Sequence, residues 1–363
     1  SKNYEMLQTL NNYTKKNFFK NDLDNFISNS NLKLNSVLII GGAGTIGSNY
    51  LKQILKFRPS LVCVVDINEN GLTELTRDLR SSKLLDYSPN YITYPVNLLS
   101  DTFDKLYNMN RWDVVSNFSA HKHVRSEKDK ISVEALVKNN VYGAIKLLRL
   151  CEINPPKYFF SVSTDKAANP VNIMGASKSL MEKLILSKKH RFRVSTARFA
   201  NVAFSNGSLL DGFIQRLNKK QPLSCPSDIK RFFVSPKQSG QICLLATFLG
   251  HSGNIFFPKL DFHKDQIYFK DIALDFLKEN GFEPELVKSE KEAKEFDFDS
   301  NPSKYPIYFF KTDTSGEKTY EEFYTEEEDY NTDNYDSLGF INTPEIKISF
   351  EDVEFDFEKV FSN

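Results

Sequence analysis

Between residues 36 and 199, short apolar segments alternate with longer amphipathic ones, and this alternation restricts the possible folds more than any other feature. The apolar segments, which we predict to be strands, lie at 36–40, 61–66, 91–96, 112–119, 157–163 and 192–199. The intervening segments, which we predict to be helices, lie at 45–57, 70–81, 101–108, 133–152 and 176–189. Strands that are apolar almost throughout are typical of a parallel sheet covered by helices on both faces. The sequence therefore predicts an α/β fold.

A glycine-rich stretch, "GGAGTIGS", joins the first predicted strand to the first predicted helix. Gly41, Gly44 and Gly47 have the spacing of a dinucleotide-binding loop, and Thr45 and Ile46 lead from it into the helix. Glycines permit a tight turn and the close approach of a pyrophosphate, and the helix N-terminus attracts phosphates. This context predicts a Rossmann-like, doubly wound parallel sheet. The alternative is a glycine turn that only packs the helix closely against the strand.

Polar residues follow the second and third predicted strands. Asp66 ends the second strand about twenty residues after Gly47, where a carboxylate accepts hydrogen bonds from the hydroxyls of an adenine ribose. The same charge would repel a 2′-phosphate, so NAD is favoured over NADP, although Arg77 and Arg80 on the next helix could soften that preference. Asn97 is expected near the adenine, with a plain turn residue as the alternative.

A run of reactive side chains follows the fifth predicted strand, at the end where open α/β sheets hold their ligands. Thr164, Asp165 and Lys166 bring a hydroxyl, a carboxylate and an ammonium group together in sequence. Such a set is suited to acid–base chemistry. A polar turn between strand and loop is the alternative interpretation.

Six stretches between residue 36 and about residue 325 resemble the extended short-chain dehydrogenase/reductase superfamily. Within it they are most similar to the UDP-N-acetylglucosamine 4,6-dehydratases of the polysaccharide-biosynthesis type. The stretches are "GGAGTIGS", "NFSAHKHVRSEKD", "VSTDKAANPVNIMGASK", "TARFANVAFSNGS", "IKRFFVSP" and "SGEKTYEEF".

The resemblance includes one substitution in the catalytic pattern. The superfamily uses a Tyr-x-x-x-Lys pair, in which the Tyr shuttles a proton and the Lys holds the nicotinamide ribose; here the two positions are Met174 and Lys178. One branch of the dehydratase family carries this Met, so the substitution does not imply an inactive enzyme. A second departure is the family's Arg-Pro-Gly-Glu-Lys, which reads Thr-Ser-Gly-Glu-Lys at 314–318, so any ligand contact normally made by that Arg is not carried over to this chain.

The resemblance implies a 4,6-dehydratase that converts UDP-N-acetylglucosamine to UDP-2-acetamido-2,6-dideoxy-4-keto-hexose with transient reduction of bound NAD. It makes Lys166 the base at carbon 5 and Asp165 the acid at the carbon-6 hydroxyl, while Thr164 orients the carbon-4 oxygen. It implies that further substrate contacts come from Lys122, Asn201, Arg231 and Lys259. The choice among UDP, GDP and dTDP stays open, as does the configuration at carbon 5.

Two other functions remain open. A sugar-nucleotide 4-epimerase or ketoreductase needs only hydride transfer and one proton shuttle, so a Tyr would be indispensable and Asp165 and Lys166 unnecessary. A non-catalytic NAD-binding module would account for the lost Tyr but not for the retained Asp165, Lys166 and Lys178. The residues therefore favour the dehydratase.

Composition narrows the partners and the compartment. Basic and acidic residues number 47 each, so no net charge favours nucleic acid or an anionic membrane. No apolar run reaches the roughly 18 residues that span a bilayer, and the first residues lack a signal peptide. Four cysteines without paired spacing are expected as reduced core thiols, and five scattered histidines predict no metal. We expect a cytoplasmic enzyme that binds a nucleotide sugar and forms a homodimer or higher homo-oligomer.

Three regions are expected along the chain. Residues 1–35 form an N-terminal helical extension, and residues 36–200 the dinucleotide-binding Rossmann domain. Residues 201–363 form a smaller sugar-nucleotide-binding region and an acidic C-terminal segment. The acidic stretch 321–336, "EEFYTEEEDYNTDNYD", is expected to be a surface segment or a tail that contacts a partner.

Overall fold

The chain divides into two compact units in a computed structural model. The described residues are 4, 9, 12–119, 130–162, 182–186, 192–198, 201–202, 209–312, 320, 322–344 and 349–361. The sheet unit comprises residues 18–199, 236–259 and 323–363, and the small unit comprises residues 1–17, 200–235 and 260–322.

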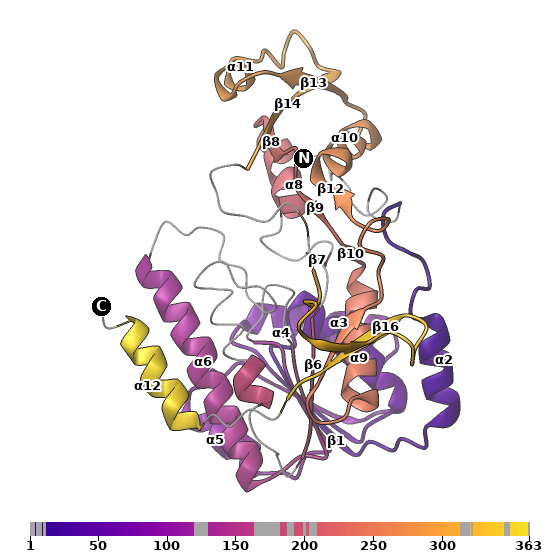
Figure 1. The fold of residues 1–363 in the computed structure, drawn as a ribbon, viewed down its shortest axis with the longest axis vertical. Coiled ribbons are helices and arrows are strands. Elements are labelled where there is room, and N and C mark those ends of the chain that lie inside the picture. Colours follow the sequence, from indigo (N-terminus) through magenta and orange to yellow (C-terminus); the bar gives the residue numbers. More distant parts are fainter. Residues whose placement is uncertain are drawn as a thin grey trace. The chain divides into compact units, whose positions relative to one another are not determined.

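A nine-stranded sheet, in the order β15-β16-β11-β6-β5-β4-β1-β2-β3, forms the centre of the sheet unit (Figure 1). The parallel strands are β1 (Ser36–Ile40), β2 (Leu61–Val65), β3 (Asn90–Tyr94), β4 (Val114–Asn117), β5 (Tyr158–Val162), β6 (Arg193–Ala197) and β11 (Asn254–Pro258). Antiparallel β16 (Leu338–Asn342) and β15 (Asp329–Asn331) extend one edge. The predicted Rossmann-like α/β fold is confirmed. The strand order reverses between β1 and β4, which is where such sheets bind ligands.

Helices cover both faces of this sheet. Helix α3 (Thr45–Ile54) contacts β1, and α9 (Pro236–Leu249) contacts β5, β6 and β11 and packs along α3. A Cβ atom at Gly240 of α9 would lie 2.4 Å from the main-chain oxygen of Asn49, so glycine permits this close packing. Because crossovers are right-handed and the strand order reverses after β3, the helices that follow β3 and β4 belong to the other face. They are α5 (Asp101–Asn108) and α6 (Lys130–Ile153), and α12 (Phe350–Phe361) packs on α6 (Figure 1).

Further helical segments in the described part of the sheet unit are α4 (Glu69–Ser81), the 3₁₀ turn η1 (Leu55–Phe57), α2 (Lys20–Asn29) and residues 182–186. Phe26 of α2 is buried and stacks on Phe248 of α9, with ring centroids 5.9 Å apart. The carboxylate of Asp22 accepts a hydrogen bond from the main-chain N–H of Ser337 at 2.7 Å. This part of the predicted N-terminal helical extension is therefore packed on the sheet unit.

The small unit is built on a parallel three-stranded sheet in the order β13-β14-β8. Its elements are β7 (Asn201–Val202), α8 (Leu209–Asn218), β8 (Leu223–Pro226), β9 (Lys230–Arg231), β10 (Phe233–Val234), β12 (Ile267–Tyr268), α10 (Phe269–Glu279), β13 (Glu283–Val287), α11 (Glu290–Lys294) and β14 (Lys304–Phe310). Its core is rich in phenylalanine, isoleucine and leucine. Residues before 18 belong to it, since Tyr13 donates a hydrogen bond to Asp275 of α10 and Lys15 pairs with Asp265.

The division of the chain differs from the boundaries expected from the sequence. Residues 236–259 and 323–363, which the sequence grouped with the C-terminal region, lie in the sheet unit. The physical reason is that α9 has ten buried residues among fourteen and β11 is buried throughout, so both need the main sheet for cover. The acidic stretch 321–336, expected as a surface segment or a tail, lies at the surface in its described part, where only Phe323 is buried, and it contains β15, which pairs with β16.

The four cysteines are free and buried, as predicted: Cys63, Cys151, Cys225 and Cys243. In the part of the chain that the structure describes, no helix is long and apolar enough to cross a bilayer.

Candidate functional site

The glycine loop is packed so tightly that two of its positions require glycine. Gly41 has φ of +76°, and a Cβ atom there would lie 2.6 Å from the main-chain nitrogen of Ser119, just past β4. A Cβ atom at Gly47 would lie 2.5 Å from the main-chain oxygen of Gly41. Gly44 differs, because its backbone is extended and its Cβ would meet nothing closer than 3.6 Å. The loop therefore brings the start of α3 against the ends of β1 and β4.

Helix α3 offers its N-terminus at this loop. The helix begins at Thr45, and its N-cap residue Gly44 supplies no side-chain hydrogen bond. The first N–H groups of a helix, here those of Thr45, Ile46 and Gly47, have no partners within the helix. They carry the positive end of the helix dipole, which attracts a phosphate group.

Asp66 lies directly after β2 and holds the same loop. One of its carboxylate oxygens accepts the N–H of Ala43 at 3.0 Å, and the other accepts the N–H of Asn68 at 2.9 Å. A carboxylate has about four acceptor positions, so each oxygen can accept a further hydrogen bond. The structure thus brings together Asp66 and the glycine loop, which the sequence assigned to one cofactor.

Two more predicted residues follow strands at the carboxyl edge of the sheet, which all the parallel strands share. Asn97 comes three residues after β3 and is exposed, and its side-chain oxygen accepts the N–H of Leu99 at 2.9 Å. It therefore forms a turn, and its contact with an adenine remains a prediction. Lys259 directly follows β11 and is also exposed, while its N–H donates to the main-chain oxygen of Ser337 at 2.8 Å.

Six predicted site residues lie outside the described residues: Lys122, Thr164, Asp165, Lys166, Met174 and Lys178. In sequence, Thr164 comes two residues after the end of β5, and Lys122 five residues after the end of β4. Their roles remain predictions.

The last two predicted residues belong to the small unit. Asn201 lies in β7, in register with Phe233 of β10. Arg231 lies in β9 opposite Ile267 of β12, and its buried side chain donates to the main-chain oxygen of Lys230 at 2.8 Å. Their contacts with a substrate also remain predictions.

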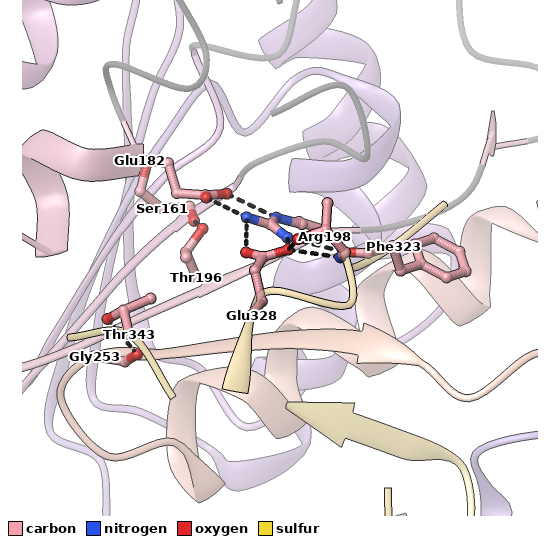
Figure 2. A network of polar contacts seen from close by, with 9 residues as sticks. Ser161, Glu182, Thr196, Arg198, Gly253, Phe323, Glu328 and Thr343 are labelled. Carbon is pink, nitrogen blue, oxygen red and sulfur yellow. Dashed lines mark hydrogen bonds and ion pairs between the residues drawn. The ribbon is translucent and has the colours of Figure 1, made fainter. Parts of the chain in front are cut away.

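Arg198, which the sequence analysis did not single out, directly follows β6 and is only 2% exposed. Its Nε and one Nη donate to the two oxygens of Glu182, at 3.1 and 2.6 Å. Both Nη atoms donate to Glu328, each at 3.0 Å, and one of them also donates to the main-chain oxygen of Phe323 at 2.9 Å. Figure 2 shows the guanidinium between the two carboxylates.

This network keeps Arg198 charged. Burial disfavours the charged guanidinium, but ion pairs with Glu182 and Glu328 outweigh that cost and raise the pKa of Arg198 above its ordinary value. The sequence signal that could have found it is an arginine near the end of the strand predicted at 192–199, which is expected to be buried. A charge in that position needs partners, because an unpaired buried charge is strongly unfavourable.

The strand order, the glycine loop and the position of Asp66 define a Rossmann-like α/β protein with a loop of the dinucleotide-binding type. Residues 37–343 match the family model described as polysaccharide biosynthesis protein. The chain belongs to this family.

Its similarities to curated proteins include three of different kinds. An uncharacterized membrane protein of Methanocaldococcus jannaschii is 30% identical over 326 residues, covering 87% of each chain. A UDP-N-acetylglucosamine 4,6-dehydratase (inverting) of Campylobacter jejuni is 28% identical over 62% of this chain and 67% of that protein. A UDP-glucose 4-epimerase of Rickettsia bellii is 30% identical over 62% of this chain and 66% of that protein. The chain is thus related to nucleotide-sugar-modifying enzymes. It spans 44% of the polysaccharide-biosynthesis relatives from Bacillus subtilis and Staphylococcus aureus.

Solved structures support the fold. Pen from Bacillus thuringiensis has a TM-score of 0.69 at 22% identity, over 91% of this chain and 98% of that one. DesIV, a dTDP-glucose 4,6-dehydratase from Streptomyces venezuelae solved with NAD and TYD, has a TM-score of 0.56 at 18% identity, over 78% of this chain and 86% of that one.

Proposed function

We propose that this chain is an NAD-dependent nucleotide-sugar 4,6-dehydratase that converts UDP-N-acetylglucosamine to UDP-2-acetamido-2,6-dideoxy-4-keto-hexose. The observation that carries the proposal is the sequence Thr164-Asp165-Lys166, which starts two residues after β5, a central strand of the parallel sheet. An acid and an amine next to each other suit the elimination of water. The similarity to the Campylobacter jejuni dehydratase supports the substrate class.

The glycine loop and Asp66 fit NAD. Because Gly47 has no side chain, the start of α3 packs closely against the loop, and the helix N-terminus is available to a pyrophosphate. Asp66 retains acceptor positions for the ribose hydroxyls. The negative charge of Asp66 disfavours the 2′-phosphate of NADP. When bound, NAD would supply hydride transfer, taking a hydride from carbon 4 of the sugar and returning it to carbon 6.

The chain's own residues would move the protons. Oxidation at carbon 4 acidifies the carbon-5 proton, which Lys166 would remove. Lys166 would also return a proton to carbon 5 when carbon 6 has been reduced. A lysine can act as a base only when neutral, so its pKa must fall from about 10.4 through desolvation or nearby positive charge. Asp165 would protonate the departing carbon-6 hydroxyl, which requires a protonated carboxyl and hence a raised pKa.

Three further residues would orient the reactants. Thr164 would hydrogen-bond the carbon-4 oxygen, and Lys178 would hold the nicotinamide ribose. Met174 cannot take the proton from the carbon-4 hydroxyl, so we assign that step to Asp165 as a carboxylate or to a water that it holds. The proton gained in this step would be the one that Asp165 later gives to the carbon-6 hydroxyl. The substrate would be bound by Lys122, Asn201, Arg231 and Lys259, of which the arginine can contact a diphosphate through two hydrogen bonds.

Incubation with UDP-N-acetylglucosamine in deuterium oxide tests the proposal. We expect a 4-keto-6-deoxy product with deuterium at carbon 5, detected by NMR and mass spectrometry, and no net formation of NADH. Lys166→Ala and Asp165→Asn should abolish turnover and leave NAD bound. The matched controls Lys219→Ala and Asp333→Asn change exposed residues and should retain turnover. Full activity in either site variant would remove the assigned roles.

The second candidate is a sugar-nucleotide 4-epimerase or ketoreductase, which the similarity to the Rickettsia bellii epimerase favours. An epimerase would give the carbon-4 epimer without solvent deuterium, and a ketoreductase would consume added NADH with a 4-keto sugar. A protein that binds NAD but turns over no nucleotide sugar would be the non-catalytic module.

A further inference from the structure

The Arg198 guanidinium joins three segments that are distant in sequence. Its partners are Glu182, sixteen residues before it, and Glu328 and Phe323, 130 and 125 residues after it. An arginine has five N–H donors in a rigid planar fork, and here each of the five has an acceptor. The fork therefore fixes the positions of both carboxylates relative to the end of β6.

The acidic C-terminal stretch 321–336 is held by the pairing of β15 and by the hydrogen bonds of Glu328. Glu328 directly precedes β15, which pairs with β16 at the sheet edge. One carboxylate oxygen of Glu328 also accepts the N–H of Thr325 at 2.9 Å. The Glu328 side chain is 24% exposed, whereas that of Glu182 is 7% exposed. This surface stretch thus supplies the Glu328 carboxylate as a partner to the buried Arg198.

The second carboxylate has a sequence relation to the proposed active site. Glu182 lies in the helical residues 182–186 and comes four residues after Lys178. In the helix predicted for 176–189, residues four apart lie on one face, one turn from each other. In that predicted helix, an anchor at Glu182 would set the rotation and the axial position of the turn that carries Lys178.

We propose that Arg198 is a positioning residue, held in place by Glu328, and that through Glu182 it aligns Lys178 with the nicotinamide ribose. The inference rests on the role of Lys178 in the proposed function. It makes the acidic C-terminal stretch part of the support of the cofactor site.

Glu328→Gln is the sharpest perturbation of this arrangement. Glutamine keeps the shape of the side chain and one acceptor oxygen, but its amide nitrogen would face an N–H donor of Arg198 and cannot accept from it. The fold should survive, while the guanidinium loses part of its anchor. Glu327→Gln is the matched control, because Glu327 is the exposed neighbour with the same charge.

The test compares two ligands that contact different parts of the cofactor site. NADH contains the nicotinamide ribose, whereas ADP reaches only the glycine loop and Asp66. We expect Glu328→Gln to weaken NADH binding fivefold or more, measured by nicotinamide fluorescence, and to leave ADP affinity within twofold, measured by calorimetry. Arg198→Lys, which keeps the charge without the fork, should give the same split, and Glu327→Gln should change neither affinity.

Other outcomes overturn the inference. Equal weakening of NADH and ADP would mean that the network only stabilises the sheet unit, and unchanged affinity for both would mean that it does not reach the cofactor. With UDP-N-acetylglucosamine, Glu328→Gln should lower kcat at least fivefold and keep KM within twofold. If the unmodified protein turns over no nucleotide sugar but the NADH and ADP affinities still separate, only the proposed function fails.

Discussion

Gly47→Ala tests whether the loop at the start of α3 is as tightly packed as the structure indicates. The added Cβ would lie 2.5 Å from the Gly41 oxygen and 3.0 Å from the Gly42 Cα, both of which are backbone atoms. Ordinary contact begins near 3.4 Å, so the helix must retreat from the loop by almost 1 Å. Overpacking of this kind costs about 3 kcal/mol at the upper end of the usual range, since no side chain can rotate away.

The gain in helix propensity offsets part of this cost. Alanine is favoured over glycine in a helix by about 1 kcal/mol, which leaves a net loss of about 2 kcal/mol. The sheet unit has about 250 residues. For a unit of that size, a net loss of about 2 kcal/mol lowers the melting temperature by roughly 4–8 °C. The affinity for NADH should also fall, because the displacement of α3 moves its N-terminus away from the cofactor's phosphates.

Gly44→Ala is the matched control for this substitution. Its φ of −73° suits any residue, and its Cβ would meet only ordinary contact. We expect a melting temperature within about 2 °C of the unmodified protein, since losses at an N-cap and gains from a stiffer unfolded chain are both below about 1 kcal/mol. NADH affinity should nevertheless fall, because the methyl group occupies the approach of the pyrophosphate. Scanning calorimetry and fluorescence titration separate the effects. An unchanged melting temperature for Gly47→Ala would refute the packing argument, and unchanged NADH binding by Gly44→Ala would refute the assignment of the loop.

Three further predictions concern the cofactor, the thiols and the N-terminal helix. Asp66→Asn should weaken NADH binding about tenfold, which is the loss expected for a charged hydrogen bond. It should also reduce the preference for NADH over NADPH. The exposed control Glu69→Gln should do neither, and a titration in which Asp66→Asn binds NADH normally would contradict the ribose assignment. Burial raises the pKa of three of the four core thiols to about 12, from 9.0. Their contribution to stability is therefore fully present below pH 9 and is lost as the pH rises towards 12. A thiol reagent at pH 8 should label none of the four cysteines before the protein unfolds. Labelling of the native protein would disprove their burial. Phe26→Ala truncates a buried aromatic side chain and should lower the free energy of unfolding by about 3 kcal/mol, which a lower urea midpoint would show. Ile27→Ala, at the exposed neighbour, should change the midpoint little. Equal midpoints for the two variants would show that α2 does not stabilise the sheet unit.

The sequence predicted the first half of the sheet well because its signals are local. Helix α5 was predicted at its observed bounds, where Ser100 caps it by accepting the N–H of Phe103. The first strand was also predicted at its observed bounds, since a buried five-residue apolar run beside a glycine loop has few other interpretations. The glycine loop and Asp66 could be assigned to one site for the same reason, as they end neighbouring strands.

The second half was harder because its partners are distant in sequence. Strand β11 joins the sheet beside β6, about sixty residues earlier, and β16 returns about eighty residues after β11. Nothing within the residues 254–258 indicates which of two sheets they join. Asn97 illustrates a different limit, because a residue type that binds ligands also forms turns, and the sequence cannot choose between the two.

The buried arginine shows why charge composition alone misleads. Equal numbers of acidic and basic residues indicate only that the chain has no net charge, yet one guanidinium lies between two carboxylates beneath the surface. Replacing such buried ion networks by apolar side chains is often neutral or even stabilising by about 1–4 kcal/mol, because desolvation offsets the attraction. Stability is therefore a weak reason for the chain to contain Arg198 between Glu182 and Glu328. Orientation is a stronger one, since a planar fork with all five donors bonded permits one arrangement of its partners, whereas apolar packing would let the segments slide.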